Sequence, residues 1–444
     1  MAAVDPSIYE KFTIESTDGN RTVDIRQGVV GFVYYENILA PSITATAVVV
    51  NTGGSIKNKE GKRQGIYNGL PLRGGERVII KIAGNSKNNK GLDFSEYPTQ
   101  YFYVGSISNV MVDAEKEIFT LNLISREAIT NQTVRVGRKF PTSQTISDSV
   151  EDIIKEYLKS DKIGQIDQTQ NKYGFIGNLK KPFAIMTWLA SKSVAYVGPG
   201  KDSTAGFLFF QTQEGFNFRS VDNLISQSPF EKDYTFSPGV VKFDDPSKDF
   251  KIIKYNVDRN QDLLGKLKRG AYSSERYYIN PVSFKPDIRH FKATDYMGDD
   301  GLNNLGDEKI TLPSIDDDKS LGDLPTRIFV GMLDIGTVEK TTTDKGWNDP
   351  AERNADPAKT QAQSMMRYNQ LLTQVVEITV PLNTNLRAGV VIRCVFPSID
   401  REKRKTADSN SSGLYMISEL AHYFDTKGSY TKLKLLRDSS GRKW

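Results

Sequence analysis

Apolar and polar residues alternate in short runs through the first 140 residues of the chain. The runs, which Gly/Asn-rich or charged links separate, lie at 29–40, 43–50, 76–82, 101–107 and 118–124. They are rich in β-branched and aromatic residues, which suit a pleated, half-buried surface. Short strands with frequent turns are typical of an antiparallel barrel or sandwich. The pattern therefore predicts a first β-barrel domain over residues 1–140.

The spacing of apolar residues changes after this segment. Residues 142–160 place apolar side chains at helical intervals, with Thr142 or Ser143 in position to cap a helix. Residues 180–193 predict a second helix, in which Pro182 suits the first turn. Because this second segment is apolar almost all round, we expect it to be buried.

Residues 207–225 contain two aromatic runs around a short polar link that ends in glycine. This order predicts a β-hairpin, with Phe209 and Phe216 buried in the core of a small α/β domain over residues 141–244. The side chains expected to pack against the hairpin are Phe183, Trp188 and Leu189.

Strand-like runs return at 250–257 and 276–284. Residues 290–356 are rich in Asp, Gly, Asn and Thr, and only 327–336 forms an apolar run within them. Residues 361–374 predict a helix, and the remainder of the chain again has the texture of strands.

The two ends of the chain resemble each other. Residues 103–126 align without a gap with residues 415–438. The matched residues include Tyr103/Tyr415, Ser106/Ser418, Asp113/Asp425, Leu121/Leu433 and Leu123/Leu435. Upstream of each block, a Leu-Arg-[Gly/Ala]-Gly sequence at 72–75 or 386–389 precedes an apolar strand. The ordered recurrence of two blocks favours a duplication over a chance similarity of two hairpins.

The duplication predicts two similar β-domains in a mainly β fold with an α+β insertion. The first domain is 1–140, and the second is assembled from 245–285 and 373–444. The small α/β domain lies between them, and residues 286–372 interrupt the second domain as an insertion of unknown role. We expect both β-domains to be antiparallel β-barrels.

Histidine and cysteine, two residue types that often act in catalysis or bind metals, are few in this chain. The only two histidines are His290 and His422, and the sequence offers no Ser/His/Asp set or metal-ligand cluster. The single cysteine, Cys394, lies in an apolar strand-like run, which favours a buried, inert thiol. We therefore expect no enzymatic activity and no catalytic, cofactor-binding or metal-binding residues.

Several polar segments have a simpler explanation than ligand binding. Residues 198–206 lack the spacing of a phosphate-binding loop. The acidic residues Asp299, Asp300, Asp307 and Asp316–Asp318 lack the spacing of a twelve-residue calcium loop, which favours a solvated acidic loop. The basic clusters lie at 57–63, 266–270 and 401–405, and solvated loops explain them best.

Composition narrows the class of protein. The chain has 444 residues, and 59 basic against 54 acidic residues give a net charge of +5, which is too small to indicate nucleic-acid binding. No apolar run reaches the roughly 18 residues of a membrane helix, and the first residues do not have the pattern of a signal peptide. We expect no stable membrane insertion, and the single cysteine fits a reducing compartment.

Three segments resemble the baseplate central hub subunit of T-even-like contractile-tailed phages, especially cyanophage hubs. The same broad fold is expected in phage late-control hub proteins and type VI secretion spike hubs. The segments are a tryptophan helix with the aromatic hairpin (187–225), the strand after the Leu-Arg-Ala-Gly turn (382–398), and the C-terminal hairpin (412–441).

The resemblance implies a structural virion protein that forms a homotrimer. Each chain would give two tube domains to a ring of six, which joins the tail tube to the trimeric central spike and leaves a channel for DNA. Implied partners are the spike protein, the tail tube or tube-initiator protein and neighbouring baseplate proteins, with DNA only as passing cargo. The implied location is the tail baseplate of the virion, after assembly in the host cytoplasm.

Two other functions remain open from the sequence. A carbohydrate-binding or adhesin-like tail protein would expose aromatic platforms in the insertion, where Trp347 and Tyr296 are candidates. A hydrolase is less favoured because histidine is sparse. If DNA slides through a ring, the clusters at 57–63 and 401–405 are expected to face neighbours or solvent, since a continuous basic lumen would bind phosphates and slow its passage.

Overall fold

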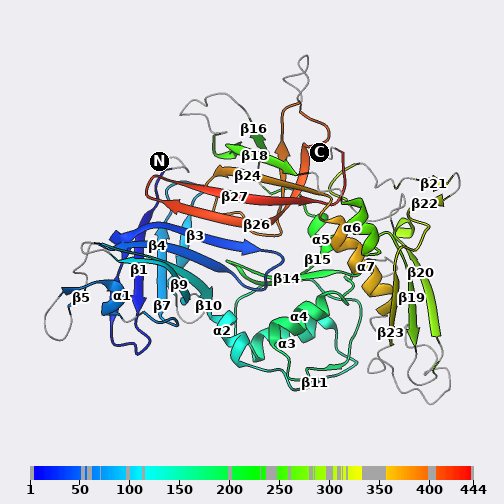
Figure 1. Ribbon diagram of the computed structural model, residues 1–444, viewed down its shortest axis with the longest axis horizontal. Coiled ribbons are helices and arrows are strands. Elements are labelled where there is room, and N and C mark those ends of the chain that lie inside the picture. The colour runs from blue at the N-terminus through cyan, green and yellow to red at the C-terminus, as the bar shows by residue number, and fades with distance from the viewer. Residues whose placement is uncertain are drawn as a thin grey trace.

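The computed structural model gives one β-rich body with smaller units beside it (Figure 1). The described residues are 5–51, 56–57, 63–70, 72–96, 101–112, 116–198, 203–230, 232–236, 248–258, 262–279, 284, 286–296, 304–307, 312, 314–316, 319–332, 357–398 and 407–441. In Figure 1 the early strands (blue) lie beside the last strands (red), so both ends of the chain build the same body. The expected mainly β fold class is confirmed.

The helices are short, and the two in the middle of the chain occur where the sequence predicts them. The helices of the described residues are α1 (Ile66–Gly69), α2 (Arg126–Thr133), α3 (Ile146–Glu156), α4 (Pro182–Ala190), α5 (Val221–Ile225), α6 (Leu263–Lys268) and α7 (Pro357–Gln370), with 3-10 turns η1 (Arg26–Gly28), η2 (Lys248–Phe250) and η3 (Ala293–Tyr296). Pro182 opens α4 as expected. The cap of α3 is Thr145, not Thr142 or Ser143, because residues 142–144 form a turn before the helix.

The first copy of the repeat is an antiparallel sheet. Its strands are β1 (Ile8–Glu15), β2 (Thr22–Asp24), β3 (Val29–Asn37), β4 (Thr44–Asn51), β7 (Arg77–Ala83), β8 (Gly91–Phe94), β9 (Phe102–Val112) and β10 (Glu117–Ser125). Five of them follow the order β3–β4–β10–β9–β7, and β1 extends the sheet beyond β7. A short separate hairpin consists of β5 (Ile56–Lys57) and β6 (Arg63–Gln64).

The second copy repeats this order. Its strands are β16 (Tyr234–Phe236), β17 (Lys251–Ile252), β18 (Lys254–Asp258), β24 (Gln374–Pro381), β25 (Val391–Val395), β26 (Gly413–Asp425) and β27 (Gly428–Arg437). The order β18–β24–β27–β26–β25 matches the first copy strand for strand, and all four pairings are antiparallel. Beyond β25 the copies differ, because β16 pairs with β25 in parallel.

The Leu-Arg-[Gly/Ala]-Gly turns make the same backbone hydrogen bonds in both copies. The bonds are Gly75 N to Val104 O (2.7 Å) and Val104 N to Glu76 O (2.9 Å) in the first copy, and Gly389 N to Ile417 O (2.7 Å) and Ile417 N to Val390 O (2.9 Å) in the second. Gly75 and Gly389 have φ angles of +92° and +88°, a region that favours glycine. The duplication inferred from the sequence therefore extends to backbone geometry.

The strand ladders correct the ungapped alignment of the two hairpins by one residue. Phe102, not Tyr103, occupies the place of Tyr415, because Val78 pairs with Phe102 where Ile392 pairs with Tyr415. Ser106 likewise does not occupy the place of Ser418, whereas Leu121 and Leu123 do occupy the places of Leu433 and Leu435. The cause is an extra residue in β9 near Asn109, which has a φ of +52° at a register shift. Asp113 lies outside the described residues.

The aromatic hairpin is confirmed as part of a core. It consists of β14 (Phe207–Thr212) and β15 (Gly215–Ser220), and all residues of both strands are buried. The rings of Phe209 and Phe216 stack with centroids 5.6 Å apart, and Phe183 of α4 contacts both. Trp188 and Leu189 belong to the same apolar cluster. The remaining strands of this unit are β11 (Lys139–Phe140), β12 (Ile163–Ile166) and β13 (Phe175–Ile176).

A separate three-stranded sheet contains part of the insertion. Its strands, in the order β20–β19–β23, are β19 (Ser273–Ile279), β20 (Pro286–Lys292) and β23 (Ile328–Met332), and β21 (Ser314–Asp316) pairs with β22 (Lys319–Ser320) nearby in sequence. Strand β19 lies within the range 245–285 that the sequence assigns to the second β-domain, and among the described strands it pairs with β20 and β23. The division into domains stays a prediction.

Candidate functional site: the junction of the two sheets

Strand β26 joins the two copies into one continuous sheet. Its first residues pair with β25, and from Glu419 to Asp425 it pairs antiparallel with β3. The ladder runs from Glu419↔Asn37 to Asp425↔Gly31. In Figure 1, β26 lies alongside β3. The junction is made by main-chain hydrogen bonds, so it fixes how one copy sits against the other.

Aromatic side chains fill the buried face of this junction. The rings of Phe32 and Phe424 lie 6.0 Å apart, and His422 stacks on Tyr34 with centroids 6.2 Å apart. The Nδ1 atom of His422 is 2.9 Å from the hydroxyl of Thr431. Burial, followed by the charge of nearby Arg387, lowers the pKa of His422 to about 3. The imidazole is therefore neutral at pH 7 and serves packing.

A buried carboxylate, Glu36, ties three segments together at the junction. It accepts hydrogen bonds from the hydroxyl of Tyr34 (2.8 Å), the amide of Gln213 in the β14–β15 turn (2.7 Å) and the amide of Ala388 in the second copy (2.8 Å). Burial raises the pKa of Glu36, while Arg387 and the two amides oppose this rise. Glu36 thus holds the first sheet, the aromatic hairpin and the second turn in one arrangement.

The first copy satisfies the corresponding amide by itself. Gly74, the counterpart of Ala388, donates to Glu76 of its own turn at 2.9 Å. The second copy has Val390 at the position of Glu76, so the carboxylate must come from elsewhere. Glu36 supplies it from the first copy. The two turns have the same backbone bonds but differ in whether they need the neighbouring sheet.

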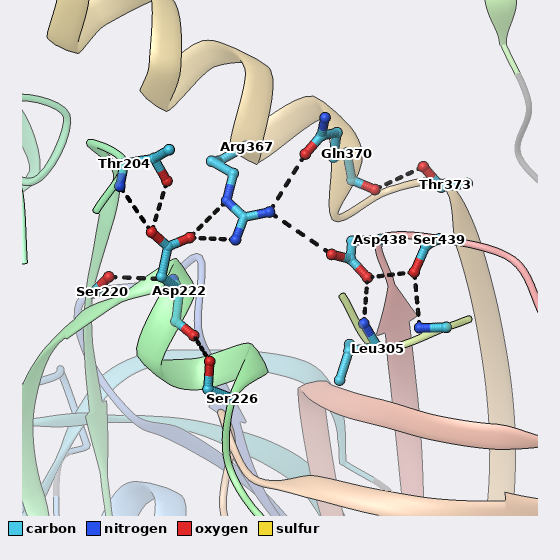
Figure 2. A network of polar contacts seen from close by, with 11 residues as sticks. Thr204, Ser220, Asp222, Ser226, Leu305, Arg367, Gln370, Thr373, Asp438 and Ser439 are labelled. Carbon is cyan, nitrogen blue, oxygen red and sulfur yellow. Dashed lines mark hydrogen bonds and ion pairs between the residues drawn. The ribbon is translucent and has the colours of Figure 1, made fainter. Parts of the chain in front are cut away.

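A second buried polar network connects helix α7 to the end of the chain (Figure 2). Arg367 donates from Nε to Asp222 of α5 at 2.8 Å, and its Nη1 lies 3.8 Å from Asp438. The other oxygen of Asp222 accepts from the amide and hydroxyl of Thr204, at 2.9 and 2.8 Å. The amide of Leu305 donates to Asp438 at 2.9 Å. The network joins the middle unit, the insertion and the segment that directly follows β27.

The pKa values of the two carboxylates in this network shift in opposite directions. Burial acts to raise the pKa of Asp222, but Arg367 and the donors on Thr204 outweigh burial and lower it overall. Burial raises the pKa of Asp438, with Arg367 in partial opposition. One guanidinium lies between two buried carboxyl groups, and each carboxyl group also accepts a hydrogen bond from a backbone amide. Such a satisfied buried network holds the connected segments in fixed positions.

The solvent face of the joined sheet forms a groove of about 960 Å³. Charged residues of both signs line it: Lys254, Lys432, Lys434, Glu377 and Glu419 on strands of the second copy, and the buried Glu36 on β3 of the first. Lys434 lies 3.2 Å from Glu419, and Lys432 lies over the ring of Tyr423 at 4.8 Å. The face is therefore polar with balanced charge, and it offers no concentrated anion-binding surface.

The residues that the sequence singled out do not converge on a chemical site. Cys394 is fully buried, which raises the pKa of its thiol. The Nε2 atom of His290, on β20, lies 2.8 Å from the hydroxyl oxygen of Ser273. His422 lies on β26, which belongs to a different sheet. Among the described residues, no group of three or more His, Cys, Asp or Glu side chains is placed to hold a metal.

The structure describes the polar segments only in part. In segment 198–206, Thr204 binds Asp222, so its hydroxyl serves the buried network. Residues 401–405, 58–62, Asp299, Asp300, Asp317 and Asp318 lie outside the described residues, and so does Trp347. In cluster 266–270, Lys266 lies on α6 and donates to Thr373 at 3.1 Å, which makes this cluster partly helical. No described helix is long and apolar enough to span a membrane.

Sequence reasoning missed Glu36 and the Arg367 network. A signal for Glu36 is present, because Phe32, Tyr34 and Glu36 alternate on one face of an apolar run, which places a charge on the buried side. Arg367 carries no such signal, since its partners are distant in sequence.

Comparisons with known proteins support the fold. No family model matches the chain, and no curated protein matches it. The 43 kDa tail protein of prophage MuSo2 from Shewanella oneidensis has a TM-score of 0.51 and 10% identity, with 97% of this chain and 98% of that chain covered. A tail protein from Neisseria meningitidis MC58 has a TM-score of 0.50 and 10% identity, with 96% of each chain covered. The chain thus has the fold of these phage tail proteins, which confirms at the level of the fold the resemblance seen in the sequence.

Proposed function

We propose that this chain is the structural subunit of a phage baseplate hub and acts as a homotrimer. The observation that carries the proposal is the five-stranded sheet that occurs twice, with the same strand order and the same turn hydrogen bonds. Three such chains would place six similar sheets around one axis, which allows a trimer to match a hexameric ring. The likeness of the whole chain to phage tail proteins supports the same conclusion.

In this role the ring joins the tail tube, or a tube-initiator protein, to a trimeric central spike. Neighbouring baseplate proteins contact its outer surface, and the location is the virion tail after assembly in the host cytoplasm. The role is mechanical, so the buried ties at Glu36 and Arg367 serve it by fixing the sheets and the middle unit relative to one another.

We further propose that the polar groove on the joined sheet faces the channel through which DNA passes. Contacts of Lys and Arg with phosphates dominate nucleic-acid affinity. The groove is lined by three basic residues, Lys254, Lys432 and Lys434, and by three acidic ones, Glu36, Glu377 and Glu419. A surface of this composition gives DNA little to bind, which suits a conduit.

The test is the mass of the purified chain in solution, measured by light scattering over a range of concentrations, followed by electron microscopy of the particles. We expect three times the chain mass of 49.7 kDa and a ring with a central opening. A monomer at all concentrations and without a ring would contradict the proposal. Of the two aromatic residues considered for sugar binding, Tyr296 is half-buried and stacks on Phe291 with centroids 5.6 Å apart.

A further inference from the structure

The junction inside the chain uses only half of the edges that the repeat provides. The junction joins β26 of the second copy to β3 of the first. By strand order, the counterpart of β26 in the first copy is β9, and the counterpart of β3 in the second copy is β18. Past Tyr103, β9 pairs only with β10 among the described strands, and β18 pairs only with β24. Within the part of the chain that the structure describes, each copy of the repeat therefore leaves one strand edge unpaired, β9 in the first copy and β18 in the second.

The free edge of β18 matches β3 residue for residue. Phe32 pairs with Ala47 and Tyr34 with Ala45 in the first copy. At the equivalent positions Tyr255 pairs with Ile378 and Val257 with Val376. The offset is constant along the whole ladder of β18. The second copy thus presents the same kind of edge that accepts β26 in the first.

The free edge of β9 exposes apolar side chains where β26 buries them. Val110, Met111 and Val112 are 41%, 64% and 64% exposed. On β26, Val110 and Val112 correspond to His422 and Phe424, which are 0% and 2% exposed beside β3, whereas Met111 corresponds to Tyr423, which is half-buried. An exposed apolar edge strand is a ready template for pairing with another chain. The difference in burial is what a missing neighbour on β9 would produce.

We propose that β9 of one protomer pairs antiparallel with β18 of the next copy of the same chain, in the register of the internal junction. The proposal rests on the trimer proposed above and specifies how it closes. Transfer of the pairs Tyr423↔Val33 and Phe424↔Phe32 places Met111 opposite Asn256 and Val112 opposite Tyr255. One unpaired edge of each kind gives a head-to-tail contact, and such a contact generates a ring when the rotation between neighbours closes, which the proposed trimer requires.

Disulfide trapping tests this register. The variant Met111→Cys with Asn256→Cys, in a Cys394→Ala background, places two thiols across the proposed junction. Directly opposite residues on antiparallel strands lie about 4.5–5.5 Å apart between Cα atoms, within the range of a disulfide. Mild oxidation with copper–phenanthroline should produce covalent dimers and trimers on a non-reducing gel, and a reductant should return them to monomers.

Two matched variants serve as controls. Met111→Cys with Tyr255→Cys shifts the pair by one residue and directs the side chains to opposite faces, so it should cross-link at least tenfold less. Val33→Cys with Tyr423→Cys spans the internal junction at the equivalent pair, so its disulfide should form within one chain without a change of mass on the gel.

The outcomes separate this proposal from the trimer itself. A trimer by light scattering that gives no cross-link for Met111 with Asn256, while the internal control forms its disulfide, overturns the β9–β18 junction and leaves the trimer standing. A monomer overturns the trimer. As a second measurement, Met111→Asp with Val112→Asp changes only exposed side chains, so the chain should fold normally and the trimer should dissociate at least tenfold more readily. Unchanged trimer stability in that variant also contradicts the junction.

Discussion

Replacement of Phe216 by alanine removes a ring from the centre of the middle unit. Phe216 is fully buried, its ring stacks on Phe209 at 5.6 Å with 6° between the planes, and it lies 6.0 Å from Phe183. Such a change lowers the free energy of unfolding by about 3–5 kcal/mol, because transfer energy is lost and a cavity remains. With a urea m-value of about 1–3 kcal/mol/M, the unfolding midpoint of this unit should fall by at least about 1 M.

Tryptophan fluorescence isolates this unit in the assay. The chain has three tryptophans, and Trp188 lies against the same core. In a background of Trp347→Phe and Trp444→Phe, the signal of Trp188 follows the unit during urea titration. Phe284→Ala is the control, because Phe284 is 80% exposed and its loss should change the free energy by less than about 0.5 kcal/mol. A Phe216→Ala variant with an unchanged midpoint but with lost binding to a sugar or a protein would refute the reasoning.

Three further predictions concern charge. The pKa of His422 is about 3 in the folded chain and near 6.5 in the unfolded chain. The unfolded state therefore binds more protons, and the free energy of unfolding falls as the pH drops from about 6.5 toward 3. His422→Gln should lose less stability than the wild type between pH 7 and pH 5 in urea titrations. Arg367→Ala should destabilise the chain by about 3–5 kcal/mol in thermal unfolding, because Asp222 stays buried without its cation, and an unchanged melting temperature would contradict this. Lys403→Glu with Arg404→Glu, at positions outside the described residues, should leave the trimer intact and weaken ring-to-tube assembly at moderate salt; tight DNA binding by the wild type, abolished by the same change, would contradict this placement.

Local pattern in the sequence was sufficient for the elements and for the duplication. The aromatic runs around Gly215 predicted a buried hairpin, and Pro182 marked the start of α4. The recurring Leu-Arg-[Gly/Ala]-Gly turn predicted the repeat, and the positive φ angles of Gly75 and Gly389 favour glycine at this position in both copies. Such signals depend only on a residue and its near neighbours along the chain, so they can be recognised from the sequence alone.

Only the tertiary structure decided which edges meet and which charges are buried. The extra residue at Asn109 shifts the β9 ladder without changing the apolar pattern, and β19 reads like any other strand although it pairs with the insertion. The pairing of β26 with β3 and the partners of Glu36 join residues that lie hundreds of positions apart. Main-chain hydrogen bonds are the same for every sequence, and a buried carboxylate accepts any donor of suitable geometry. Edge pairing and long-range polar ties are therefore set by the shape of the folded chain and leave no periodic signal in its sequence.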